Sequence, residues 1–223
     1  MSTMATAVDR HAIHPVNVHV EPAIEQRNRL TTAFRLLLAL PHIVLVGGPA
    51  VAVLSWTASN EHGPTYEWSG GGVLGAAAAV GACIAWFAIV FTARHPQGLW
   101  NLVAFYLRWR VRAVAYTALL RDEYPPFGDA PYPASVDLGS PPVERDRLSV
   151  GLRILLAIPH LFAIWALGVA WSITTIIAWF WILVTGRMPA ELHRFGVGVL
   201  RWTTRVEAYL LLLHDEYPPF SLE

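Results

Sequence analysis

Long apolar runs separated by short polar stretches organise the chain. Residues 34–56 and 72–92 each supply enough apolar positions to cross a bilayer, which takes about twenty residues at ~1.5 Å rise each. Residues 148–185 form one more apolar run, which we interpret as two helices of roughly 17 residues joined by a turn at Gly168. The pattern therefore predicts four membrane spans arranged as two helical hairpins.

An amphipathic segment follows each predicted hairpin, at residues 99–120 and 192–213. Central arginines in a spanning helix cost about 2.5–3.5 kcal/mol each, so these segments are not predicted to span. In each segment two arginines four residues apart share one helix face. They are Arg108 and Arg112 in the first segment, and Arg201 and Arg205 in the second. We expect both helices to lie in the membrane interface, where these arginines either bind anionic lipid head groups or simply position the helix.

An internal repeat explains this order of elements. The stretch RNRLTTAFRLLLALPH at residues 27–42 recurs as RDRLSVGLRILLAIPH with an offset of 118 residues. Two later blocks, at residues 85–96 and 107–127, recur with an offset of 93. The difference of 25 residues is extra sequence between the first two helices of the first copy. The predicted organisation is a polar tail (1–13), a first membrane repeat (14–127), a linker (128–131) and a second membrane repeat (132–220).

A short alternating segment begins each copy, PVNVHVE in the first and PASVDLG in the second. Alternation of apolar and polar residues is typical of a strand, so we expect two extended arms that can pair with each other. The predicted fold class is an all-α integral membrane protein with two tandem repeats. Each repeat has a transmembrane helical hairpin, an amphipathic interfacial helix and a short extended arm.

Composition and charge placement favour a membrane location. Hydrophobic residues make up 55% of the 223 residues and charged residues 14%, against about 25% charged in soluble domains. All sixteen basic residues are arginines, and the hairpin topology places all of them on one side. The loop at residues 56–69 and the turn at Gly168 hold none. The positive-inside rule then predicts cytoplasmic N- and C-termini.

Two histidines are the sharpest candidates for chemistry inside the apolar runs. His42 and His160 each follow a proline at matched places in the two copies. A polar residue at membrane depth is a functional hypothesis by default. The rings can hold a haem between them, form a proton relay, or donate to backbone carbonyls that the prolines free. We favour hydrogen bonds to backbone carbonyls or to polar neighbours within the protein over a shared ligand.

Arg35 and Arg153 are a second matched pair within the apolar runs. Our favoured interpretation is that each reaches the lipid head groups with its long side chain. The alternative is an ion pair with a carboxylate of the Asp-Glu-Tyr-Pro-Pro-Phe segment that ends each copy. The single cysteine, Cys83, excludes an intrachain disulfide and a cysteine-cluster metal site. The chain carries no nucleophile elbow and no HExxH zinc motif.

Several of these motifs resemble a bacterial membrane family known only as domain of unknown function 4389. They are LPH, WFAIVFTARHP, LRW followed by AY, and DEYPPF in the first copy, with close counterparts in the second. The resemblance covers residues 14–220 as two copies. It departs at the longer loop of the first copy and at Ala93, where the pattern favours the glycine seen at Gly186. It implies a location in the bacterial inner membrane and no established activity.

These observations lead us to expect a non-catalytic membrane scaffold or accessory subunit without a cofactor. It would contact anionic lipids through a basic interfacial platform, and a larger membrane complex, but not nucleic acid. Two alternatives stay open. One is a small transporter or channel at the interface between the repeats, and the other is a redox protein with haem held by His42 and His160.

Overall fold

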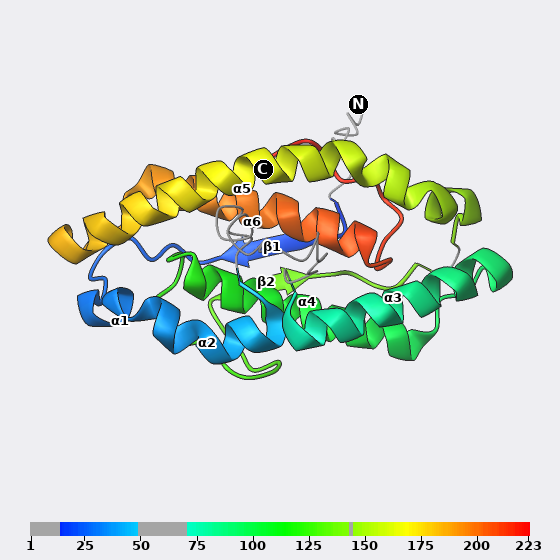
Figure 1. Cartoon of the computed structure of the whole chain (residues 1–223), viewed down its shortest axis with the longest axis horizontal. Coiled ribbons are helices and arrows are strands. Elements are labelled where there is room, and N and C mark those ends of the chain that lie inside the picture. Colours follow the sequence, from blue (N-terminus) through cyan, green and yellow to red (C-terminus); the bar gives the residue numbers. More distant parts are fainter. Residues whose placement is uncertain (1–13, 49–70, 143–144) are drawn as a thin grey trace, which may run out of the picture.

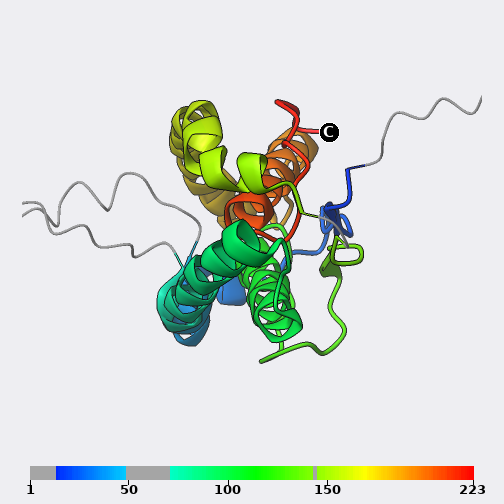
Figure 2. The ribbon, with the colours of Figure 1, turned by 90° about the vertical axis from the view of Figure 1, so that its right-hand side faces the viewer.

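The computed structural model describes residues 14–48, 71–142 and 145–223. These residues form a mostly helical protein with one small sheet, as the sequence predicts. The elements are, in order, β1 (Asn17–Val20), α1 (Arg29–Ala33), α2 (Arg35–Val46), α3 (Gly72–Thr92), α4 (Gln97–Thr117), β2 (Ala134–Asp137), α5 (Arg147–Thr185) and α6 (Ala190–Leu210). In Figure 2 they lie in layers: α5 beside α1, α2 and α3, then α4 and α6, then the strands.

Helix α5 is continuous over 39 residues. The predicted turn at Gly168, and with it the second hairpin, is therefore wrong. A single glycine costs a helix only about 1 kcal/mol, and the surrounding alanine, leucine and tryptophan residues outweigh that cost. Gly168 is also buried, and the Ser172 hydroxyl donates to its carbonyl at 2.8 Å.

The first copy builds a similar long helix from separate pieces. In Figure 1, α3 continues end to end from α1 and α2 in the same direction, so these helices form no hairpin. Gly72, at the start of α3, has φ +65°, and a Cβ there would lie 2.6 Å from the Leu45 carbonyl carbon at the end of α2. The repeat offsets place Val46 opposite Ile164 and Gly72 opposite Trp165. The 25-residue insert thus separates positions that are adjacent in α5.

Part of the predicted first hairpin falls on residues that the structure does not describe. The predicted span at residues 34–56 is helical as far as Val46. Its end and the whole of the predicted loop at residues 56–69 lie outside the described ranges. Within those ranges, α3 and α5 are long and apolar enough to cross a membrane by length and composition, whereas the apolar α2 is shorter.

The third helix of each copy lies in the centre of the molecule. Most side chains of α4, and about half of those of α6, are buried. The expectation of an arginine face turned to head groups is wrong for Arg112 and Arg205, which are each only 7% exposed. Both side chains can be buried because their guanidinium groups donate to acceptors within the protein.

The two extended arms form an antiparallel pair, which confirms the predicted strands. Val18 lies opposite Val136 at the centre of the pairing. Asn17 pairs with Asp137, and His19 with Ser135, so matched positions of the two copies exchange partners. The valines face the core, and the polar residues of both strands face outwards.

Two tryptophans join the long helices of the two copies. The Trp86 indole nitrogen donates to the Val150 carbonyl at 3.0 Å, and Trp179 donates to the Thr32 carbonyl at 2.9 Å. Both donors and both acceptors occupy matched positions in the sequence repeat. The contact between the copies is therefore made twice, once in each direction.

Candidate functional site

The Asp-Glu-Tyr-Pro-Pro-Phe segment of the first copy anchors two buried arginines. Asp122 accepts from Arg27 Nε at 2.8 Å and also from Arg35 Nη2. Burial alone would raise the pKa of Asp122, but the hydrogen bonds and charges of Arg27 and Arg35 hold that pKa below its ordinary value. The carboxylate is thus committed to neutralising two guanidinium groups.

The second copy repeats this cluster. Asp215 contacts Arg145 Nη2 at 2.9 Å and is hydrogen bonded to Arg153. In both copies the guanidinium also lies over a tyrosine ring, at 4.2 Å for Arg35 over Tyr116 and 4.4 Å for Arg153 over Tyr209. Of the two interpretations offered for Arg35 and Arg153, the structure has the ion pair, and both side chains are almost fully buried.

His42 lies in an aromatic cluster next to Pro41 of α2. Its ring stacks on Phe127 with centroids 4.6 Å apart, and Trp109 donates its indole N–H to His42 Nδ1 at 3.0 Å. Of the favoured partners, backbone carbonyls or polar neighbours within the protein, this ring has a polar neighbour, the Trp109 indole, from which Nδ1 accepts. The cluster ties the end of the first copy back to its first helix.

His160 has a similar set of neighbours in the second copy. Its ring stacks on Phe220 at 4.0 Å and meets Trp202 edge-on at 5.8 Å. Within the described residues neither ring nitrogen of His160 has a hydrogen-bond partner, and neither does the indole nitrogen of Trp202. The aromatic neighbours of His160 and His42 share no residue, so the structure does not bring the two rings together around a common ligand.

The four arginines proposed for lipid head groups all contact the protein's own chain. Arg112 donates to the Gly128 carbonyl at 2.6 Å, and Arg205 to a Glu223 oxygen at 2.5 Å. The half-exposed pair make longer contacts, Arg108 to Asp129 at 3.6 Å and Arg201 to the Leu222 carbonyl at 3.3 Å. Of these four arginines, only Arg108 and Arg201 keep a substantial exposed surface.

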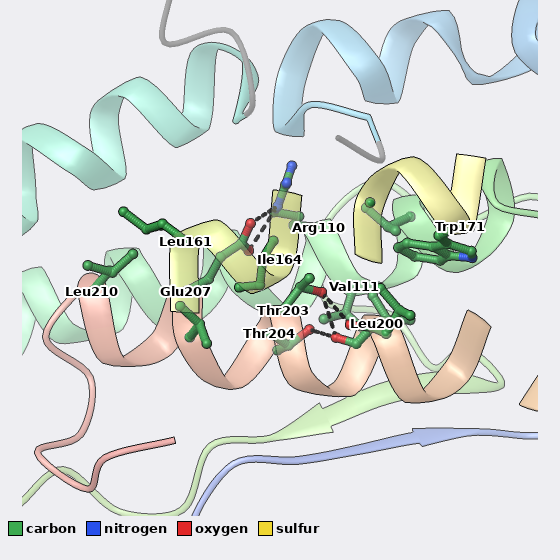
Figure 3. Close-up of a pocket in the computed structure, with 14 residues that line it drawn as sticks. Arg110, Val111, Leu161, Ile164, Trp171, Leu200, Thr203, Thr204, Glu207 and Leu210 are labelled. Atoms are coloured by element: carbon green, nitrogen blue, oxygen red, sulfur yellow. Dashed lines mark hydrogen bonds and ion pairs between the residues drawn. The ribbon is translucent and has the colours of Figure 1, made fainter. Parts of the chain in front are cut away.

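A pocket of about 330 Å³ lies where α4 and α6, from different copies, meet α5. Figure 3 shows that Leu161, Ile164 and Trp171 of α5 contribute to its wall, opposite residues of α6. The lining is predominantly apolar. Its polar members are Arg110 from α4 and Thr203, Thr204 and Glu207 from α6.

An ion pair between the copies borders this pocket. Arg110 Nε lies 2.9 Å from both carboxylate oxygens of Glu207, as Figure 3 shows. The same guanidinium donates through Nη1 to the carbonyl of Val46 at 2.9 Å. Arg110 therefore links α4 to α6 and to the last residue of α2, directly before the insert.

Sequence reasoning missed the pairing of Arg110 with Glu207. The signal that reveals it is a departure from the repeat. Arg110 corresponds to Thr203 in the second copy, and Glu207 corresponds to Val114 in the first. Two complementary charges that break the repeat one helical turn apart indicate a contact between the third helices.

Comparison with known proteins places this arrangement within one family. The family model described as "Domain of unknown function (DUF4389)" matches residues 71–128 and 147–221. The matched segments hold α3 with α4 and α5 with α6, each followed by its Asp-Glu-Tyr-Pro-Pro-Phe segment. Neither the curated proteins nor the solved structures contain a match.

Proposed function

The chain belongs to the family of domain of unknown function 4389, and on that premise we propose that it is a non-catalytic integral membrane protein that acts as a scaffold or accessory subunit. The observation that carries this proposal is the exposed apolar surface of the long-helix layer, meaning α1, α2, α3 and α5. Its most exposed large side chains include Val184 at 76%, Phe91 at 74%, and Ile154 and Phe162 at 72%. Exposed apolar surface that continues along whole helices marks a membrane or protein interface.

The opposite face of the molecule supports the same assignment. The outward positions of the two strands are Asn17, His19, Ser135 and Asp137, which are all polar and exposed. Figure 2 places this ribbon on the far side of α4 and α6 from the long-helix layer. One broad face thus suits lipid and the other suits water.

The length of α5 bears on its orientation. A helix of 39 residues is about 58 Å long, well beyond the ~30 Å hydrocarbon core of a bilayer. Exposed arginines lie at both of its ends, at Arg147 and Arg187. We infer that the long-helix layer lies along the bilayer and does not cross it repeatedly. This orientation keeps every described arginine and the C-terminus on one side, which the positive-inside rule makes cytoplasmic.

The pairing of the inner carboxylates with arginines favours a structural role. Asp122, Asp215 and Glu207 are each engaged with buried arginines, and they hold helices together. A scaffold needs such fixed geometry, whereas a catalytic carboxylate needs access to a substrate. Contact with anionic lipids is proposed for Arg108 and Arg201, since Arg112 and Arg205 are buried.

Fractionation tests the membrane assignment directly. The chain, expressed in a bacterial host, should stay in the membrane pellet after washing with alkaline carbonate. Release into the supernatant would contradict it. Purification from native membranes under mild detergent should then retain a stoichiometric membrane partner if the scaffold role is correct.

A small transporter or channel is the second candidate, and the pocket between the copies is the observation that favours it. A transport route requires polar residues along a path through the molecule. Here the polar lining is limited to the Arg110–Glu207 pair and two threonines. Solute flux in proteoliposomes, compared between the wild-type chain and Glu207→Gln, separates this candidate from the scaffold.

A further inference from the structure

The polar groups around the pocket at α4, α5 and α6 are already engaged by the protein. The Glu207 carboxylate receives Arg110, and Arg110 also binds the Val46 carbonyl. The Thr203 hydroxyl donates to the carbonyl of Val199 at 2.8 Å, and the Thr204 hydroxyl to that of Leu200 at 2.7 Å. A ligand in this pocket therefore need not supply a charge, and the wall that it meets is mainly hydrocarbon.

The pocket wall includes an exposed residue of the layer that we assign to lipid. Leu161 of α5 contributes to this wall, and its side chain is 47% exposed. Ile164 and Gly168 continue the same wall inwards along the helix. A hydrocarbon chain in the surrounding bilayer would thus meet the pocket beside Leu161 without passing through water.

The size fits part of such a chain. A volume of about 330 Å³ is roughly twice that of a dry protein cavity that binds benzene. It lies at the small end of ligand pockets, which hold ~300–1,000 Å³. The space suits a flexible apolar chain and not a large rigid cofactor.

We propose that this pocket binds a hydrocarbon chain, supplied either by a membrane lipid or by a free fatty acid. The lipid source rests on the proposed membrane embedding. The mainly apolar wall, the satisfied polar groups and the exposure of Leu161 together specify this ligand class. Arg110 and Glu207 border the chain and join the two copies around it.

Photocrosslinking tests the proposal. Full-length protein in phosphatidylcholine vesicles is irradiated with two probes in separate samples, a phosphatidylglycerol and a free fatty acid, each with a diazirine in its chain. Crosslinks should map to pocket residues of α6, such as Thr203 and Leu200, as well as to exposed residues of α5. The probe that labels α6 identifies the source of the chain.

A pocket-filling substitution and a matched control complete the test. Ile164→Trp should reduce α6 crosslinking several-fold, whereas Ile173→Trp, on the exposed surface of the same helix, should leave it unchanged. Thr203→Trp fills the pocket from α6 if Ile164→Trp does not fold. Crosslinks confined to the exposed face of α5, unchanged in both filling variants, would overturn the proposal. If the free fatty acid labels the pocket but alkaline carbonate releases the protein from membranes, the proposed membrane embedding is refuted. The proposal that the pocket binds a hydrocarbon chain then stands.

Discussion

Arg110 of the first copy holds both carboxylate oxygens of Glu207 of the second copy at 2.9 Å, although neither charge occurs at the matched position of the other copy. The pair lies between the central helices and is largely buried on the arginine side. It therefore distinguishes the two halves of a molecule whose other contacts are mostly duplicated.

Removing both members of this pair is expected to cost less than the sum of the two single losses. Arg110→Thr and Glu207→Val each install the residue of the other copy. Glu207→Val leaves the buried Arg110 guanidinium unpaired, at a cost of about 3 kcal/mol, whereas Arg110→Thr leaves the partly exposed Glu207 and should cost less. The double variant should recover part of this loss, with a coupling of about 1–2 kcal/mol. Chemical denaturation of the four proteins in one detergent gives the coupling. Strictly additive losses would show that the two residues act independently.

The aspartates of the two Asp-Glu-Tyr-Pro-Pro-Phe segments are predicted to stabilise the fold equally. Asp215→Asn leaves Arg145 and Arg153 buried without a counter-charge, so we expect a loss of about 3 kcal/mol. Asp122→Asn should cost a similar amount. Glu216→Gln, the exposed neighbour in the same segment, is the matched control and should be nearly neutral. Equal melting temperatures for Asp215→Asn and Glu216→Gln would contradict the assignment.

Substitution by Phe is predicted to destabilise the protein more at His42 than at His160. His42→Phe removes the acceptor of the Trp109 indole N–H and should cost about 1–3 kcal/mol. His160→Phe removes no hydrogen bond that the structure contains and should cost less, while keeping the stack on Phe220. Thermal unfolding of both variants compares them. An absorbance spectrum of the wild-type protein adds a check, because a Soret band lost in either variant would move the chain to the redox class.

Acid is predicted to weaken the contact between the N-terminal arm and α6. Burial, with the charge of Arg205, lowers the pKa of His14 to about 4 from an ordinary 6.5. Between these two pKa values, His14 is mostly neutral in the folded state and mostly protonated in the unfolded state. Stability from this residue is full above pH 6.5 and falls as the pH drops towards 4. His14→Asn, which keeps an acceptor for the Val16 N–H, should flatten this decline, and the exposed His19→Asn should not.

Local pattern predicted the individual elements better than their arrangement. Alternation identified both strands, and the repeat identified which residues correspond, including Trp86 with Trp179. The turn at Gly168 failed because length was used to divide an apolar run that contains no strong helix breaker near its middle. Span length says how much chain a bilayer can hold, but not whether the chain turns.

The arginines show a second limit of the sequence. Their spacing placed Arg108 with Arg112, and Arg201 with Arg205, on common faces, but it could not say what covers each face. The answer depends on Asp129 and on the chain end at Glu223, which fold back from distant positions. The partner of Arg110 was recoverable only by reading where the copies differ.

The long-helix layer is predicted to lie along the membrane with both ends of α5 on the cytoplasmic side. Single cysteines at Arg147 and Arg187, in a Cys83→Ser background, test it with a membrane-impermeant maleimide. Both positions should label only after the cells are permeabilised, and a cysteine at Ile173, in the exposed apolar middle of α5, should label poorly throughout. Labelling of either end in intact cells would contradict the account.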